Sequence, residues 1–165
     1  MDFFDVIKNR KSVREYSEKP VSKDLIQKIV DAGRLAATAR NEQPWEFIAM
    51  SDKKVLKRIC DMCPNGPFIK EASYLIGVFC RDTKYYLEDG SAATQNMLLA
   101  IEALGLGGCW VAGDKKDYAE NVRQILNAPM GYKLVSMVTV GYPKKQEKPH
   151  PKRGLKEVLH WEGYA

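Results

Sequence analysis

One segment near the middle of the chain limits the possible folds more than any other. A helix that begins at Asp89 or Ser91 and runs through Leu104 is apolar nearly all round, and Gly105 follows as the residue that ends it. A helix without a polar face must be surrounded by protein, so we expect it at the buried centre of the fold. The chain has 165 residues, of which 45% are hydrophobic, and this suffices for a single domain that spans residues 1–165.

The segments around this helix predict the class of fold. The apolar run from Ser73 to Cys80 is typical of a central strand that is buried on both faces. Further strands are predicted at 45–50, 108–112 and 133–142, and further helices at 2–9, 53–62, 117–127 and after the N-cap Ser22. Two helices precede the first strand, which favours an α+β fold with helices on both sides of a small sheet.

The amino-acid content excludes several classes of protein. The longest apolar stretch, 97–113, is shorter than the ~20 residues of a membrane helix and contains Glu102. The chain opens without the apolar core of a secretory signal, so we expect a cytoplasmic protein with no membrane segment and four reduced cysteines. Cys60 and Cys63 form a C-x-x-C that is a redox pair, half of a metal site, or two ordinary thiols on a helix end.

Familiar catalytic constellations are absent from the sequence. The chain has two His, both near its C-terminus, so we expect neither a metal site nor a His-based triad. No side chain is therefore predicted to be catalytic. If the chain is an enzyme, we expect a cofactor to carry the chemistry while the protein binds and orients it.

The net charge of +5 is small but concentrated at the two ends of the chain. One cluster is RKSVR at 10–14, and the other lies in a Pro- and Lys-rich tail that begins at about 143. Guanidinium groups bind phosphate through two hydrogen bonds, and the Ser12 hydroxyl adds another polar group. On spacing alone, each cluster is also typical of a solvated surface. Aromatic residues lie in apolar segments rather than among Lys and Arg, which speaks against nucleic-acid binding.

Four motifs resemble, in the same order, those of the FMN-dependent nitroreductase family. They are RKSVREY at 10–16, ATARNEQPWEF at 37–47, DGSAATQNMLLAIEALGLGGCW at 89–110, and VGYP at 140–143 followed by PKR at 151–153. They cover the chain end to end, and its length resembles the compact subgroup without inserted lid helices. The resemblance implies a nitroreductase-like three-layer α-β-α fold with a small central mixed sheet around the buried central helix.

The resemblance also implies a homodimer with FMN at its interface and a C-terminal tail, about 143–165, that reaches the cofactor site or the partner subunit. The FMN phosphate is then expected at Arg10 and Arg153, with Lys11 and Lys152 nearby. Ser12 is expected at the ribityl or phosphate oxygens.

The isoalloxazine ring of FMN has its own expected partners in this resemblance. Arg14 is expected at the N1/O2 edge, where a cation stabilises the negative charge of reduced flavin. The backbone N–H groups of Ala112 and Gly113 are expected to face N5 and O4, and Asn65 to lie near the polar edge. Glycines at 107, 108 and 113 are expected to let the backbone approach the ring. The expected contributions of the partner subunit come from Thr38, Ala39 and Asn41.

The activity implied by the resemblance is an NAD(P)H-dependent oxidoreductase. NADH or NADPH gives hydride to N5 of FMN, and a nitroaromatic, a quinone or a similar acceptor then takes the electrons, in a ping-pong scheme. Two alternatives stay open: a flavin-fragmenting or reductively dehalogenating relative, and a non-enzymatic module that binds anions or nucleic acid. The candidates for the substrate side, equally suited to core or rim, are Phe68, Tyr85 and Tyr86. Trp45 is expected in the interface core, Trp110 is expected to pack, and Gln43 is expected to tie its loop to the backbone.

Overall fold

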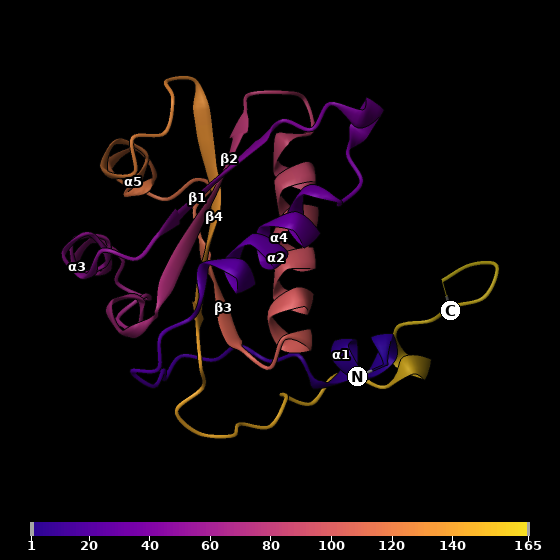
Figure 1. Cartoon of the computed structure of the whole chain (residues 1–165). Helices are drawn as coiled ribbons and strands as arrows, with labels where there is room; N and C mark the ends of the chain where they lie inside the picture. The colour runs from indigo at the N-terminus through magenta and orange to yellow at the C-terminus, as the bar shows by residue number, and fades with distance from the viewer. Residues whose placement is uncertain (1, 165) are drawn as a thin grey trace.

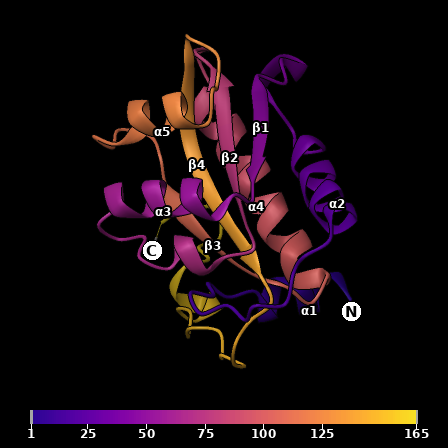
Figure 2. The same ribbon diagram turned by 60° about the vertical axis from the view of Figure 1, so that its left-hand side comes forward.

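The computed structural model describes residues 2–164 and consists of a four-stranded sheet between two layers of helices. One face of the sheet is covered by α2 (Lys23–Arg34) and α4 (Tyr86–Ala103), and the other by α3 (Lys53–Met62) and α5 (Ala119–Ile125) (Figures 1 and 2). The short helix α1 (Phe3–Asn9) packs against α4. Three 3-10 turns complete the helical elements: η1 (Ala39–Asn41), η2 (Ile69–Glu71) and η3 (Leu155–Glu157).

The sheet contains β1 (Trp45–Met50), β2 (Tyr74–Arg81), β3 (Gly107–Ala112) and β4 (Tyr132–Gly141), in the order β1-β2-β4-β3. All three pairings are antiparallel. The α+β class and the three layers are thus confirmed, whereas the expectation of a mixed sheet is wrong for these strands. The crossover through α4 makes β2 and β3 run in the same direction, but β4 lies between them and runs opposite to both.

Two apolar cores lie on the two faces of the sheet, and β2 contributes to both. Leu75 and Phe79 face α3 and α5, while Ile76 and Val78 face α2 and α4. Successive side chains of a strand point to opposite faces, so a strand with a core on each side is apolar throughout. The predicted double burial of this strand is therefore confirmed. No helix among residues 2–164 is long and apolar enough to cross a membrane.

Helix α4 packs across the sheet but is not surrounded on every side within one chain. Ala93, Met97 and Ile101 are buried against the sheet, whereas Gln95 and Ala103 on its outer side are exposed. The expectation of a fully buried central helix is therefore only partly met in this structure. A shallow, mostly apolar groove follows this outer side, lined by Phe3, Val6, Ala32, Asn96, Leu99, Ala100 and Ala103.

The C-terminus of α4 ends in a Schellman motif. The Gly105 N–H donates to the Glu102 carbonyl at 3.0 Å, and the Leu106 N–H donates to the Ile101 carbonyl at 2.9 Å. Gly105 has a φ of +70°, a left-handed conformation that costs other residues about 1–2 kcal/mol. This turn, predicted from the sequence, sends the chain from α4 into β3.

Replacing Gly105 by Ala should lower the free energy of unfolding by about 1 kcal/mol, because only the backbone conformation opposes the methyl group. No atom outside the turn lies within 4 Å of the added Cβ. Urea denaturation would measure the loss. Gly163→Ala, which is equally open but has no positive φ, should leave stability within about 0.5 kcal/mol of the parent. Equal stabilities for the two variants would contradict this reading of the turn.

Candidate functional site

The basic segment after α1, residues 10–14, is extended rather than helical. Arg10 is the C-cap of α1 with φ −56° and ψ 131°, and the chain then runs along the free edge of β3. The Val13 N–H donates to the Gly108 carbonyl at 2.9 Å in a parallel bridge that joins Ser12 to Gly108. An extended chain alternates its side chains, so Arg10, Ser12 and Arg14 share one side of this segment.

Lys11 lies on the other side of this segment. Its ammonium contacts the Glu102 carboxylate of α4 at 3.2 Å, and both side chains are largely buried. The Lys11 Nζ also donates to the Asn9 carbonyl at 3.3 Å. The structure thus places this predicted phosphate ligand in an ion pair that fastens the segment to α4, apart from Arg10, Ser12 and Arg14.

The three remaining donors of the segment meet beside one thiol of β3. Burial raises the pKa of Cys109, while the Arg14 guanidinium, the Ser12 hydroxyl and the Arg10 charge each lower it. The Arg14 guanidinium carbon also lies 5.8 Å from the centre of the Phe68 ring. Neither Arg10 nor Arg14 forms a salt bridge with an acidic side chain of residues 2–164. Two guanidinium groups and a hydroxyl are therefore available to an anionic ligand at this edge.

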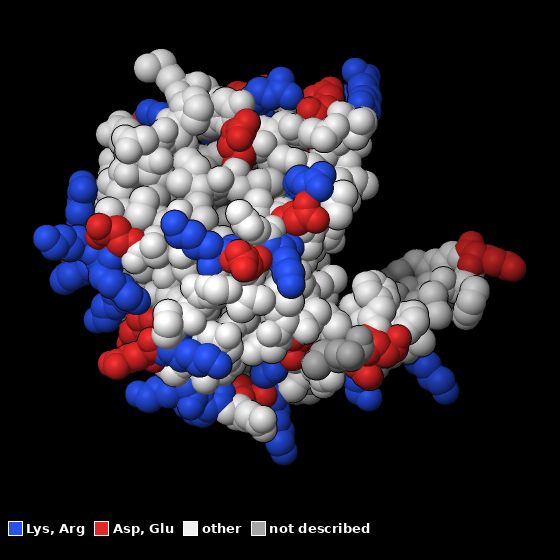
Figure 3. Space-filling model, viewed as in Figure 1, with Lys and Arg blue, Asp and Glu red and all other residues white. Residues whose placement is uncertain are grey.

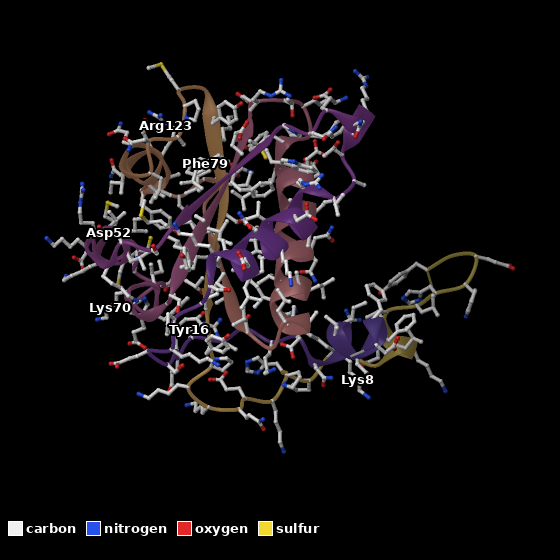
Figure 4. The ribbon with its side chains drawn as sticks, viewed as in Figure 1. Lys8, Tyr16, Asp52, Lys70, Phe79 and Arg123 are labelled. Atoms are coloured by element: carbon white, nitrogen blue, oxygen red, sulfur yellow. The ribbon has the colours of Figure 1, made fainter. Side chains whose placement is uncertain are left out.

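A buried hydroxyl network holds the basic segment onto the sheet. The Tyr16 hydroxyl lies 2.6 Å from both the Val13 carbonyl and the Thr139 hydroxyl. The Thr139 hydroxyl also accepts from the Cys109 N–H at 3.2 Å, so the network links the segment to β4 and β3. Tyr16, labelled in Figure 4, lies at the end of the sheet, and burial raises its pKa. The sequence did not reveal this network, although a Thr within the apolar strand β4 indicates a buried hydroxyl that needs a partner.

The end of β3 is shaped by a bulge in β4. The pairing of β2 with β4 shifts between Val78 and Phe79, which leaves Val135 without a partner in β2. The Val135 carbonyl instead accepts from the Asp114 N–H at 3.2 Å, directly after Gly113. The Tyr118 hydroxyl donates to the Ala112 carbonyl at 2.5 Å. Bulges of this kind occur often beside active sites, where they redirect the chain.

The glycines around β3 serve internal packing, and close approach of their backbone to the flavin stays a prediction. A Cβ on Gly107 would lie 2.8 Å from Val13, and one on Gly108 would lie 2.9 Å from Ile101. A Cβ on Gly113 would lie 2.6 Å from Leu134. The missing side chains thus leave room for neighbouring residues of the same chain.

Asn65 lies in the turn between α3 and η2, and it lines a hollow of about 470 Å³ together with Met62, Lys116, Tyr118 and other residues of the α5 side. Ala112 is the residue to which Tyr118 bonds, so Asn65 and the end of β3 adjoin the same region.

Cys60 and Cys63, just before this turn, are free and buried. Burial raises the pKa of Cys63 to about 11, which keeps the thiol neutral at pH 7 and weakly reactive. Cys60 Sγ donates to the Pro67 carbonyl at 3.5 Å. These contacts favour the reading of two ordinary thiols. No group of three or more His, Cys, Asp or Glu among residues 2–164 could hold a metal ion.

The residues expected from a partner subunit lie at the other end of α4. Thr38, Ala39 and Asn41 belong to the loop around η1, and the Ala39 N–H donates to Asp89 in the first turn of α4. Lys11 is fastened to Glu102 in the last turn. Glu102 follows Asp89 by thirteen positions, or about 20 Å at 1.5 Å per residue. Within one chain, the two sets of predicted residues are therefore far apart.

The tail begins beside the basic segment. Tyr16 forms an antiparallel bridge with Pro143, and the Lys145 ammonium contacts the Glu15 carboxylate at 2.6 Å. The tail then leaves the body of the molecule, as Figure 1 shows. Lys152 and Arg153 are exposed on it, and the Arg153 guanidinium donates to the Glu157 carbonyl at 2.6 Å. The structure brings the start of the tail to the basic segment and shows no contact of Lys152 with Arg10.

The aromatic candidates fall into different environments. Phe68 and Trp45 are buried in the two cores, so Trp45 packs within its own chain rather than at an interface. The Tyr86 hydroxyl donates to Asp114 at 2.7 Å, while Tyr85 is 38% exposed. Trp110 is 37% exposed, so it is not a core residue of the single chain. The Gln43 amide donates to the Asn41 carbonyl at 3.4 Å, as expected of a residue that ties its loop.

Comparisons with known proteins agree on one family. The family model described as the Nitroreductase family matches residues 7–88 and 81–142. A solved structure from Parabacteroides distasonis, provisionally named as an NADH dehydrogenase/NAD(P)H nitroreductase, is 36% identical with a TM-score of 0.93 over 98% of both chains. A provisionally named nitroreductase of Desulfovibrio desulfuricans, solved in complex with FMN, is 27% identical with a TM-score of 0.87 over 100% of this chain and 99% of that one. An iodotyrosine deiodinase of Thermotoga neapolitana is 32% identical over 94% of this chain and 95% of its own length.

Tyr16→Phe should lower the free energy of unfolding by about 1–3 kcal/mol, because the Val13 carbonyl and the Thr139 hydroxyl lose a buried partner. Urea denaturation monitored by tryptophan fluorescence would measure the change. Tyr132→Phe is the matched control, since the Tyr132 hydroxyl forms no hydrogen bond with residues 2–164. A Tyr16→Phe protein as stable as the control would show that the network does not fasten the segment.

Proposed function

Since the chain belongs to the nitroreductase family, we propose that it is an FMN-dependent NAD(P)H oxidoreductase that works as a homodimer. The observation that carries the proposal is the meeting of Arg10, Ser12 and Arg14 at the free edge of β3. Two guanidinium groups without a salt-bridge partner and one hydroxyl suit the phosphate and the polar edge of a flavin nucleotide. A provisionally named nitroreductase that aligns with the whole chain was solved with FMN.

The residues of the chain divide the binding of FMN by charge and position. Arg10, helped by Lys152 and Arg153 of the tail, would hold the phosphate, and Ser12 would donate to the ribityl or phosphate oxygens. Arg14, placed beside Phe68, would lie at the N1/O2 edge, where its charge favours the reduced ring. The backbone N–H groups of Ala112 and Gly113 would donate to the N5 and O4 side. Lys11 contributes indirectly, because its ion pair with Glu102 fastens the segment.

In a homodimer, residues held at the first turn of α4 in one subunit would meet residues held at the last turn of α4 in the other, and together they would form one site. Thr38, Ala39 and Asn41 lie about 20 Å along α4 from the Lys11 anchor, and a second copy would bring them to the flavin. Phe3 and Phe4 are 61% and 74% exposed beside the apolar groove on α4. The tail exposes further apolar side chains, at Leu155, Val158, Leu159 and Trp161. Exposure of so many large apolar side chains supports a subunit interface.

Bound FMN would supply the redox chemistry, taking hydride at N5 from NADH or NADPH and passing electrons to a nitroaromatic, a quinone or a similar acceptor in a ping-pong scheme. The chain needs no acid or base side chain at the reacting atom for this scheme. Its tasks are to orient the ring, to balance its charge and to exclude water. A cytoplasmic location and the absence of nucleic acid from the site are part of the proposal. On the face shown in Figure 3, basic and acidic side chains are interspersed, which does not suit a polyanion.

Reductive dehalogenation is a second candidate, because the deiodinase relative is 32% identical over nearly the whole chain. Its alignment extends over 183 positions, which exceeds the 165 residues of this chain. The relative therefore carries residues that this chain lacks. A chain without inserted segments has less protein to enclose an amino-acid substrate, so we rank this activity below the first.

The decisive experiment is an absorbance spectrum of the purified protein before and after addition of NADH or NADPH without oxygen. We expect a flavin spectrum that either nucleotide bleaches, and a dimer by sedimentation velocity. A nitroaromatic or quinone should then restore the oxidised spectrum, whereas restoration by iodotyrosine alone would favour dehalogenation. A colourless protein that ignores added FMN would refute the proposal. A monomer that holds FMN would refute the shared site.

Arg14→Ala should make the reduction potential of bound FMN more negative, by on the order of tens of millivolts, because a cation beside N1/O2 is lost. Arg14→Lys should retain most of the effect. Lys54→Ala removes an exposed cation at the start of α3 that is not among the proposed FMN contacts, and it should leave the potential unchanged. Reduction with xanthine oxidase and a reference dye would measure all three. The assigned role fails if Arg14→Ala has the potential of the parent protein.

A further inference from the structure

The loop between α2 and β1 carries an unusual backbone. Arg40, Asn41 and Gln43 have φ values of +55°, +56° and +45°, in the left-handed region that residues other than glycine rarely adopt. Each such residue costs about 1 kcal/mol or more, and a run of them persists only where neighbouring structure holds it. Thr38, Ala39 and Asn41 of this loop are the residues that the proposed function assigns to the partner's flavin.

Contacts at its C-terminal end attach the loop to β2. The Arg81 N–H donates to the Pro44 carbonyl at 2.9 Å, and the Arg81 guanidinium donates to the Glu42 carbonyl at 3.1 Å. Within the loop, the Gln43 N–H donates to the Thr38 hydroxyl at 3.3 Å. These contacts hold residues 42–44, but none of them reaches the first turn of the loop from outside.

One buried carboxylate holds that first turn. The Ala39 N–H donates to Asp89 Oδ1 at 3.0 Å, across fifty residues of sequence. Asp89 is only 4% exposed, and its other oxygen, Oδ2, is buried without a hydrogen-bond partner among residues 2–164. A buried carboxylate with one unpaired oxygen is unfavourable for stability, so stability does not explain this residue.

We propose that Asp89 is a positioning residue for the active site, which sets the place of Thr38, Ala39 and Asn41 against the flavin of the partner subunit. The proposal rests on the proposed function. Asp89 touches no substrate and acts through the Ala39 N–H. The position of the loop is set from the first turn of α4, a rigid element that also packs on the sheet. Asp89 thus serves the geometry of the site and not the stability of the fold.

Two substitutions remove the same hydrogen bond from its two ends. Asp89→Ala removes the acceptor, and Ala39→Pro removes the donor. Proline suits position 39, because this is the first residue of η1 and Thr38 before it is extended, with φ −132° and ψ 154°. Asp89→Asn keeps an oxygen for the Ala39 N–H and removes the buried charge. Thr94→Val is the control, since the buried Thr94 hydroxyl of the same helix bonds to Gly90 and Ser136, away from the loop.

The measurement is the dissociation constant of FMN, from its release on dilution of the purified holoprotein, with sedimentation and urea denaturation on each variant. Asp89→Ala and Ala39→Pro should each remain dimeric and should each raise the dissociation constant of FMN at least tenfold. The double variant should bind FMN no more weakly than the weaker-binding single variant, because both substitutions remove the same hydrogen bond. Asp89→Asn should bind within about threefold of the parent and be equally or more stable. Thr94→Val should be destabilised without a change in FMN affinity.

The outcomes separate the inference from the function on which it rests. Parent protein that holds no FMN would overturn both. Parent protein that holds FMN, with Ala39→Pro dimers of unchanged affinity, would overturn the role of Asp89 alone. If FMN binding were weakened as much in Thr94→Val as in Asp89→Ala, this would also overturn the role of Asp89, because loss of stability would then account for the effect. If Asp89→Ala does not fold, Ala39→Pro and Asp89→Asn decide the question.

Discussion

The rigid length of α4 is the constraint on which the proposed site depends. Its first turn holds the loop around η1 through Asp89, and its last turn holds the basic segment through the ion pair of Glu102 with Lys11. A helix cannot shorten, so these two groups stay about 20 Å apart in every copy of the chain. The same helix forms one layer of the fold and exposes an apolar groove on its outer side. One element thus determines the sheet packing, the separation of the two half-sites and the surface on which a second copy would sit.

The edge of β3 shows how a short chain can hold cationic side chains at the margin of a sheet. An edge strand leaves backbone groups unpaired, and the segment that carries Arg10, Ser12 and Arg14 pairs with part of this edge. The buried hydroxyls of Tyr16 and Thr139 hold the segment on the sheet. The contacts of Pro143 and Lys145 bring the start of the tail beside it. The cationic side chains are held by backbone pairing and buried hydroxyls, so their own charges remain available to a ligand.

Local patterns predicted most of the fold, and contacts between distant residues account for what they missed. The strand Trp45–Met50 and the helix Lys53–Met62 have the predicted bounds, because alternation, caps and turn residues are all encoded nearby. The basic segment was harder: spacing alone left open whether the helix continues past Arg10, and only pairing with Gly108 makes it extended. Likewise, the residues next to Lys11 in the sequence do not indicate its ion pair with Glu102. Those next to Gly108 do not indicate that Ile101 packs where a Cβ would lie. Residue types in a motif indicate the chemistry, whereas the neighbour that each side chain meets depends on the whole topology.

The placement of half a site at each end of α4 has a consequence for inheritance. In a symmetric dimer built as proposed, each of the two sites takes its near half from one chain and its far half from the other. A chain defective at the Arg14 end and a chain defective at the Asp89 end would form a mixed dimer in which one site has both faults and the other has none. Two inactive alleles of this gene would therefore complement each other in one cell, whereas two alleles damaged at the same end would not.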